Sequence, residues 1–271
     1  APHNPGLLKT VDEVLTNVVD QAELTGKVRG MDVTVTPAEI VVRNTGSCVP
    51  VERHPETRLW APTMAFFKMN TSENYDDGTG PRFVGGRNGV GAKATMIFST
   101  ACTVTVVDAS RRKRFVQSGR NNLTVLDDPE VESKLPAGQT ASVELRWTPD
   151  LARFGGVDTL EGAVTDQIRA RVYECAAVLG ERTTVTFNGE TLTTSMRDLV
   201  VTQVVGDGGT QLHCETVKSG KRVRAEVYVA FSPEGFRPMG VANGVRCAAG
   251  THVDSGVQQA AEALVRVAGR Q

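Results

Sequence analysis

The sequence predicts an α+β fold, a layered sandwich of helices and strands followed by a separate β-rich unit. Two long amphipathic helical patterns, near 7–24 and 159–179, flank a series of strand patterns. Near residue 200 the series restarts with short strands separated by glycine-containing turns. We therefore expect two domains in the 271 residues, 1–200 and 201–271.

The amino-terminal elements are the most regular. Apolar residues recur at helical spacing from Leu7 to Leu24, which predicts an amphipathic helix. Alternating β-branched residues at 31–36 and 39–43, on either side of a Pro37-Ala38 turn, predict a hairpin. The stretch 44–91 lacks periodicity and is rich in Gly, Pro, Asn and Asp. It is too long for an ordinary connection, so we expect a functional loop there.

The remaining elements follow in order. The pattern predicts a helix at about 92–99, four strands at 101–108, 114–118, 122–126 and 141–149, and the long helix near 159–179, ended by Gly180. A strand pair at 183–192 turns at Asn188-Gly189. Beyond residue 200 we expect strands at 200–205, 211–217 and 223–231 and a closing helix at 252–267.

Composition narrows the class of protein. Hydrophobic residues make up 40% and charged residues 23%, ordinary values for a globular chain. The net charge of −1 gives no general field to attract nucleic acid, so any DNA contact is expected to be local. No apolar run approaches the roughly 18 residues of a membrane span. The five cysteines are scattered without a C-x-x-C pair, which predicts reduced thiols in a cytosolic or nuclear protein.

Three segments carry possible chemistry. Glu13 and Asn17 stand four residues apart on one helix face, where a carboxylate and an amide oxygen can hold a water and a Mg²⁺ ion, although the pair alone is also typical of a solvated helix face. Asn44-Thr45-Gly46 ends a strand, where glycine lets backbone approach a planar ligand or simply turns the chain. Gly85 to Lys93 places four glycines before a helix, which suits an anion such as phosphate, although a glycine-rich run can also serve only to turn the chain. That run lacks the P-loop spacing.

These segments, in this order, resemble the ATPase region of the type IIA DNA topoisomerases, most like the eukaryotic and viral topoisomerase II branch. The similar motifs are Asp12-Glu13-Val14-Leu15-Thr16-Asn17, Ser72-x-Asn74-Tyr75-Asp76-Asp77, Gly85 to Lys93, Thr148-Pro149-Asp150-Leu151 and Gly250 to Asp254. The resemblance implies a Bergerat-type (GHKL) ATPase sandwich for 1–200 and, for 201–271, part of a transducer domain of ribosomal S5 domain 2-like fold. It also implies that the chain stops before the transducer's Q-T-K lysine loop.

The resemblance assigns roles to residues, with ATP as the nucleotide and Mg²⁺ as the metal. Glu13 would be the general base that activates water, Asn17 the Mg²⁺ ligand, and Asn44 the contact to adenine. Ser72 and Asn74 would lie at the ribose and base. The triphosphate would be wrapped by Gly86, Arg87, Asn88, Gly89, Val90, Gly91, Ala92 and Lys93, and Lys93 would also act in catalysis.

Partners follow from the same resemblance. The complete enzyme would act on a DNA duplex as a homodimer closed at the ATPase gate, in the nucleus or in a viral factory or virion, without a membrane. Two basic runs, Arg111 to Arg114 and Lys218 to Arg224, are each expected to form a solvated hairpin turn. If one of them contacts DNA, Lys218 to Arg224 is the better candidate, because the family's transducer faces the DNA cavity.

Four residues depart from the family pattern. Cys48 replaces a glycine, Glu73 a small hydroxyl residue, Val90 an aromatic residue and Gln21 an asparagine. They leave open an alternative function, a structural or regulatory relative with little ATP turnover. A nucleotide-dependent chaperone or a repair ATPase is a third possibility, disfavoured by the Asn-Tyr-Asp-Asp loop and the transducer-like second half.

Overall fold

The computed structural model describes residues 4–68, 91–202, 213–219, 223–229, 240–242 and 245–247, together with helical positions at 256, 258, 259, 262 and 266. The chain divides into two compact units, Ala1–Thr194 and Ser195–Gln271.

The first unit is built on one sheet, in which the described residues form nine strands. They are β1 (Gly30–Val35), β2 (Ile40–Thr45), β3 (Ser99–Asp108), β4 (Lys113–Arg120), β5 (Val125–Leu126), β6 (Glu130–Ser133), β7 (Ser142–Pro149), β8 (Thr184–Phe187) and β9 (Glu190–Thr191). The spatial order is β5-β4-β3-β7-β2-β1-β8-β9, with β6 paired to β4. Only β1 and β8 pair in parallel among these described strands.

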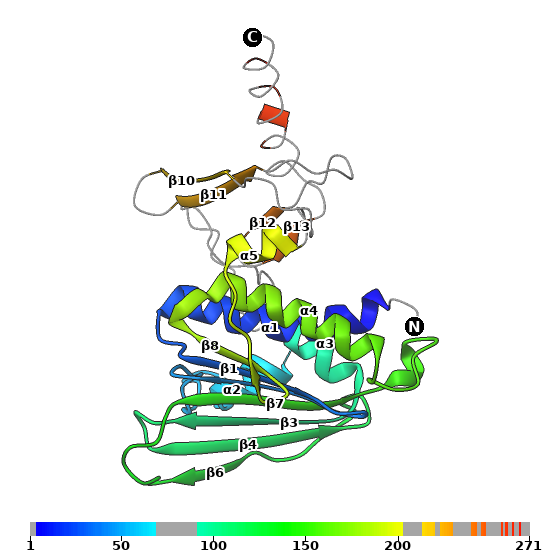
Figure 1. Cartoon of the computed structure of the whole chain (residues 1–271). Helices are drawn as coiled ribbons and strands as arrows, with labels where there is room; N and C mark the ends of the chain where they lie inside the picture. Colours follow the sequence, from blue (N-terminus) through cyan, green and yellow to red (C-terminus); the bar gives the residue numbers. More distant parts are fainter. Residues whose placement is uncertain are drawn as a thin grey trace. The chain divides into compact units, whose positions relative to one another are not determined.

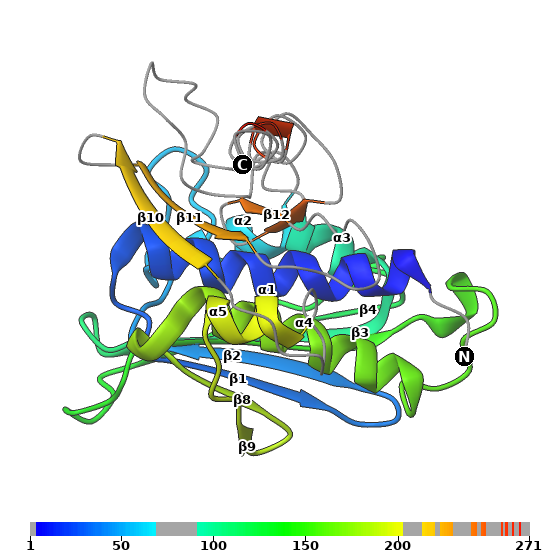
Figure 2. The same ribbon diagram turned by 45° about the horizontal axis from the view of Figure 1, so that its top comes forward.

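Helices cover one face of this sheet. Figure 1 shows α1 (Pro5–Thr25), α3 (Gly91–Ile97) and α4 (Ala163–Leu179) above the strands. Figure 2 shows α1 and α4 running side by side, and the two helices pack against each other. This arrangement confirms the predicted layered α+β sandwich.

The core fills the space between these two layers. Residues of β2 alternate between buried and half-buried. Ile40 and Val42 are on the buried face of the strand and belong to the core. Leu15 of α1, Ile168 of α4 and Trp147 of β7 are each at most 1% exposed and belong to the same cluster. Burying such a side chain contributes about 1.5–3 kcal/mol.

The sequence determines both ends of α1 locally. Asn4 caps the helix, since its side chain accepts a hydrogen bond from the Leu7 amide at 3.0 Å. Pro5 takes the first helical position, so the helix begins two residues before the predicted Leu7. At the other end, Gly26 adopts a left-handed φ of 62° and donates to Ala22.

Two predictions in the first unit were wrong. The segment 44–91, predicted to be entirely loop, contains helix α2 (Ala61–Phe67), which is only two turns long and therefore shows no clear period.

The strand predicted at 122–126 is reduced to β5. Residues 121–123 form a turn with positive φ, and Asn122 donates its side-chain amide to the Ile97 carbonyl at 2.9 Å. Strand β6 was not predicted, because its short sequence is mostly polar and exposed.

In the second unit, helix α5 (Met196–Val200) replaces the first part of the strand predicted at 200–205, and residues 201–202 continue as a helical turn. Ser195 and Asp198 form a capping box that starts this helix, which is the physical reason for the error. Residues 203–205 lie outside the described residues. Two antiparallel pairs follow, β10 (His213–Ser219) with β11 (Val223–Val229) and β12 (Gly240–Ala242) with β13 (Val245–Cys247).

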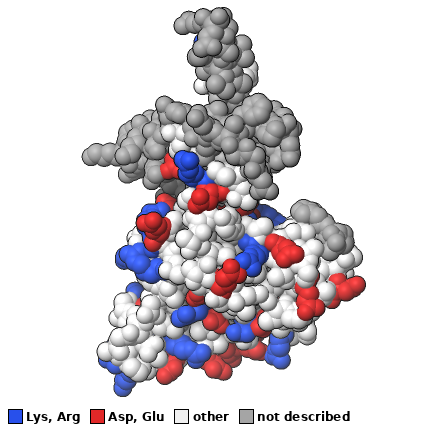
Figure 3. All heavy atoms as spheres, viewed as in Figure 1, with Lys and Arg blue, Asp and Glu red and all other residues white. Residues whose placement is uncertain are grey.

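The other predictions on bulk properties can be compared with the described residues. The five cysteines all lie within the described residues and none of them forms a disulfide, as predicted. Within the part of the chain that is described, no helix has the length and apolar character required to span a bilayer. Cations and carboxylates are interspersed over the face of the first unit seen in Figure 3.

A buried carboxylate holds the loop that follows β2 against the β3–β4 turn. Asp108 is 1% exposed and accepts hydrogen bonds from the Val51 amide at 2.9 Å, from Ser110 Oγ at 2.6 Å and from the Arg111 amide at 3.0 Å. Burial pushes the pKa of Asp108 up, but these donors and the Arg111 guanidinium outweigh burial and hold the pKa below its ordinary value.

We expect Asp108→Asn to lower the free energy of unfolding at neutral pH by about 2–3 kcal/mol, because ionised Asp108 accepts several hydrogen bonds. Since the folded-state pKa is lowered, this contribution is present above the unfolded pKa of about 3.8 and is lost as pH falls through the folded pKa. Denaturant titrations of both proteins at neutral pH and below about pH 4 measure the difference. Asp127→Asn, in an exposed pair with Arg120, is the control and is expected to cost under about 1 kcal/mol. A constant difference at all pH values would contradict the assignment.

Candidate nucleotide site

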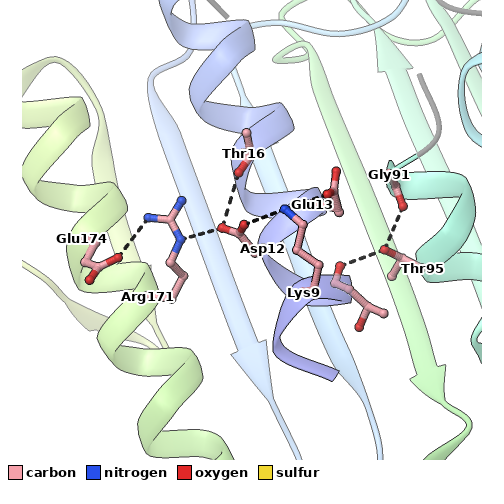
Figure 4. Close-up of polar contacts among 9 residues, drawn as sticks. Lys9, Asp12, Glu13, Thr16, Gly91, Thr95, Arg171 and Glu174 are labelled. Atoms are coloured by element: carbon pink, nitrogen blue, oxygen red, sulfur yellow. Dashed lines mark hydrogen bonds and ion pairs between the residues drawn. The ribbon is translucent and has the colours of Figure 1, made fainter. Parts of the chain in front are cut away.

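The carboxylate of Glu13 lies on α1 where that helix meets α3 (Figure 4). Lys9, one turn earlier, places its Nζ 2.8 Å from Glu13 Oε1. The Glu13 side chain is 31% exposed, so it remains open to water. Asn17, one turn later on the same face, is exposed. The predicted carboxylate and amide therefore lie on the solvent side of α1, whose opposite face is buried in the core.

The first residue of α3 lies directly against Glu13. A Cβ built on Gly91 would overlap Glu13 Oε2 and come within 2.7 Å of Glu13 Cδ. Thr95 fixes this approach, because its hydroxyl donates to the Thr10 carbonyl of α1 at 2.8 Å. A residue without a side chain is thus required where the glycine-rich segment joins α3.

Lys93 and Ala92 of the predicted phosphate loop are buried in the first turn of α3. Lys93 is 1% exposed, and this burial lowers the pKa of its ammonium group. The other residues predicted to contact nucleotide here, namely Ser72, Asn74, Gly86, Arg87, Asn88, Gly89 and Val90, lie outside the described residues.

Asn44 lies near the end of β2 and is buried, with 6% exposure. Its side-chain amide donates to the Ser47 carbonyl at 2.9 Å. Gly46 has φ of 91°, and a Cβ there would collide with the Lys27 carbonyl, so the Asn-Thr-Gly segment needs its glycine. Gln21 of α1 donates to Ser47 Oγ at 2.8 Å and ties this segment to the helix that carries Glu13.

Cys48, which departs from the family pattern, is half-buried beside this segment. Burial, together with the Asp108 carboxylate, raises the pKa of its thiol to about 11. The thiol therefore stays protonated at neutral pH and is a poor nucleophile. Glu73 and Val90, the other departures near the nucleotide, lie outside the described residues.

A group of ion pairs next to Glu13 was not predicted. Asp12 Oδ1 accepts a hydrogen bond at 2.6 Å from Nε of Arg171, a residue of α4. Arg171 also contacts Glu174 at 3.3 Å. The pairing of Lys9 with Glu13 could have been predicted, because residues four apart on a helix are neighbours. No local signal indicates the pairing of Asp12 with Arg171, because they are far apart in the sequence.

Relatives in sequence and in structure identify one family for this chain. A scan against models of protein families finds no match. DNA topoisomerase 2 of Arabidopsis thaliana is 32% identical over 256 residues, which are 92% of this chain and 17% of that protein. The crystal structure of the ATPase region of Saccharomyces cerevisiae topoisomerase II matches with a TM-score of 0.86 and 27% identity, over 98% of this chain and 69% of that one. This chain belongs to the type IIA DNA topoisomerase family, in its ATPase region.

A second solved structure is similar over the same range of the chain. The ATPase and transducer domains of DNA topoisomerase II from Balamuthia mandrillaris match with a TM-score of 0.85 and 27% identity, covering 99% of this chain and 67% of that chain. The predicted family and fold class are therefore confirmed. The chain spans less than a fifth of the length of the Arabidopsis topoisomerase.

Proposed function

We propose that this chain binds and hydrolyses ATP and serves as the nucleotide-operated gate of a type II DNA topoisomerase. The observation that carries the proposal is the packing of the Glu13 carboxylate against the Gly91 backbone, at the junction of the glycine-rich segment with α3. A carboxylate at this point can accept a proton from water while neighbouring backbone holds phosphate. The alternative of a relative without turnover is less favoured, because Glu13 is present and lies against Lys9 and the Gly91 backbone.

In this proposal each residue of α1 has a separate task. Glu13 orients the attacking water and takes its proton, and Lys9 restrains one carboxylate oxygen by the contact at 2.8 Å. Asn44 and the Gly46 turn lie on the adenine side, tied to α1 through Gln21 and Ser47. We assign the triphosphate contacts to residues 86–93, including Lys93, of which Gly91, Ala92 and Lys93 begin α3. Phosphoryl transfer requires mainly positioning and charge neutralisation, which these groups can provide.

The residues present also fit a magnesium ion. Asn17 offers an exposed amide oxygen one turn from Glu13. In the described part of the chain, no three His, Cys, Asp or Glu side chains are grouped as a metal site. Mg²⁺ needs no such group, because it takes one or two protein oxygens and completes its shell with water and phosphate. When bound, it would neutralise charge on the phosphates. We assign Asn17 as its protein ligand.

The metal proposal is tested by calorimetric titration with a non-hydrolysable ATP analogue, with and without Mg²⁺. We expect wild-type protein to bind the analogue more tightly with Mg²⁺ than without it. In Asn17→Ala this Mg²⁺-dependent increase in affinity is expected to be about tenfold smaller, which corresponds to about 1.4 kcal/mol. Leu24→Ala, at an exposed apolar position of the same helix, is the control and is expected to behave as wild type. The same Mg²⁺ dependence in wild type and Asn17→Ala would contradict the assignment of Asn17.

The domain and partner proposals rest on the likeness to the ATPase and transducer domains. We propose that unit 1–194 is the ATPase domain and that 195–271 is part of the transducer. The register of β10 and β11 places Lys218 opposite Arg224, so this hairpin is the candidate DNA contact. Homodimerisation at the ATPase gate and a nuclear location are proposed from the eukaryotic topoisomerases that the chain resembles.

A further inference from the structure

Glu13 stands at one end of a chain of ion pairs that crosses from α1 to α4 (Figure 4). Lys9 Nζ lies between two carboxylates, 2.8 Å from Glu13 Oε1 and 3.2 Å from Asp12 Oδ2. The other Asp12 oxygen, Oδ1, is bound by Arg171 Nε at 2.6 Å. Arg171 Nη1 in turn lies 3.3 Å from Glu174 Oε2. The order is therefore Glu13, Lys9, Asp12, Arg171, Glu174.

The two ends of this chain differ in how firmly they are held. The Lys9 side chain is 60% exposed, and an exposed Lys–Glu pair on one helix contributes only about 0.3–0.5 kcal/mol. Such a pair cannot by itself fix a carboxylate. Asp12 and Arg171 are 18% and 17% exposed, and their contact joins two packed helices. Within this series of ion pairs, the firmly held part is thus the pair of Asp12 with Arg171.

Asp12 carries the negative charge that is needed to attract both Arg171 and Lys9. Burial raises the pKa of Asp12, but the charge and hydrogen bond of Arg171, with a smaller effect of Lys9, outweigh it and hold the pKa below its ordinary value. Asp12 is therefore ionised at neutral pH and attracts the ammonium of Lys9. Thr16 adds a weaker hydrogen bond to the same carboxylate at 3.4 Å.

We propose that Asp12 and Arg171 are positioning residues for Glu13. Arg171 fixes the Asp12 carboxylate, Asp12 holds the ammonium of Lys9, and Lys9 restrains one oxygen of Glu13. This inference rests on the proposed function, in which Glu13 is the base. In this role Asp12 and Arg171 act on Glu13 through Lys9 and need no contact with ATP or with the attacking water. Asp12 and Arg171 influence the orientation of the Glu13 carboxylate. The rate of the chemical step depends on that orientation more steeply than nucleotide affinity does.

The test measures kcat for ATP hydrolysis and affinity for a non-hydrolysable analogue in the 271-residue chain. We expect Arg171→Gln and Asp12→Asn each to lower kcat about tenfold or more, with affinity changed less than about twofold. The double variant is expected to be no worse than either single one, since both act in one chain of contacts. Arg171→Lys, which keeps the charge, is expected to recover part of the loss.

Arg182→Gln is the matched control. Arg182 Nη2 lies 2.6 Å from Glu23 Oε1, so it also joins the end of the α4 segment to α1, but this pair is exposed and lies away from Glu13. We expect wild-type kcat in this variant. Equal losses of kcat in Arg182→Gln and Arg171→Gln would show a general effect of helix pairing and overturn the proposal. Additive losses in the double variant would overturn it as well.

Two further arms separate this inference from the proposed function. Should Arg171→Gln fail to fold by circular dichroism, Asp12→Asn, which preserves side-chain shape, decides the question by the same kcat criterion. A wild-type chain without ATP turnover, or an equally active Glu13→Gln variant, would overturn the proposed function and this inference with it. Normal kcat in both folded positioning variants, together with an inactive Glu13→Gln variant, would overturn this inference alone.

Discussion

Replacing Glu13 with glutamine is expected to lower kcat for ATP hydrolysis by about 10²–10⁴-fold, the usual contribution of a general base. Glutamine has the size of glutamate, so the packing against Gly91 is kept while the basic oxygen is lost. Affinity for a non-hydrolysable ATP analogue is expected to change little, because the carboxylate acts on water and not on the bound nucleotide. Steady-state hydrolysis and calorimetry on the same preparations measure the two quantities separately.

The control is Glu23→Gln, the same substitution on the same helix. Like Glu13, Glu23 is paired with a cationic side chain, here Arg182 at 2.6 Å, but it lies far along α1 from Gly91. We expect wild-type turnover in this variant. Retained hydrolysis in Glu13→Gln, or loss of nucleotide binding with hydrolysis intact, would mean that Glu13 is not the base.

Gly91→Ala is expected to lower kcat about 10²-fold, because a Cβ cannot fit beside the Glu13 carboxylate. The added atom would come within 2.7 Å of Glu13 Cδ, so either the carboxylate or α3 must move. Movement of α3 is opposed by the hydrogen bond from Thr95 to the Thr10 carbonyl. The conflict is also expected to cost about 1–3 kcal/mol of stability, as overpacking does. Kinetic assays and denaturant unfolding measure both effects.

Gly155→Ala is the natural comparison, because a Cβ built there meets nothing within 4 Å. It is expected to leave both turnover and stability close to wild type. A Gly91→Ala variant with wild-type kcat would show that Glu13 can move without loss, and the packing argument for the site would fail.

Features decided by local sequence could be predicted. The helix bearing Glu13 follows from apolar periodicity, and the Asn188-Gly189 hairpin follows from residues that accept positive φ, which the structure shows at 48° and 82°. The relation of Glu13 to Asn17 also follows from helix geometry alone. In each case the cause lies within a few residues of the effect.

Features decided by tertiary contact could not be predicted. The pairing of Asp12 with Arg171 joins residues that only the packing of α1 on α4 brings together. The burial of Lys93 is unexpected from sequence, because lysine is among the residues most often exposed. Helix α2 is too short to show a period. These features depend on the folded environment, which the residue pattern does not contain.

The position of β1 in the sheet affects how the protein is made. One side of β1 pairs with β2, which follows at once, but Gly30–Val33 on the other side pairs in parallel with Thr184–Phe187. Synthesis proceeds from the amino terminus, so that edge of β1 stays open until β8 has been translated. An open edge is a template for pairing with other chains. A nascent or prematurely ended chain that lacks β8 therefore carries a risk of aggregation that the finished first unit does not.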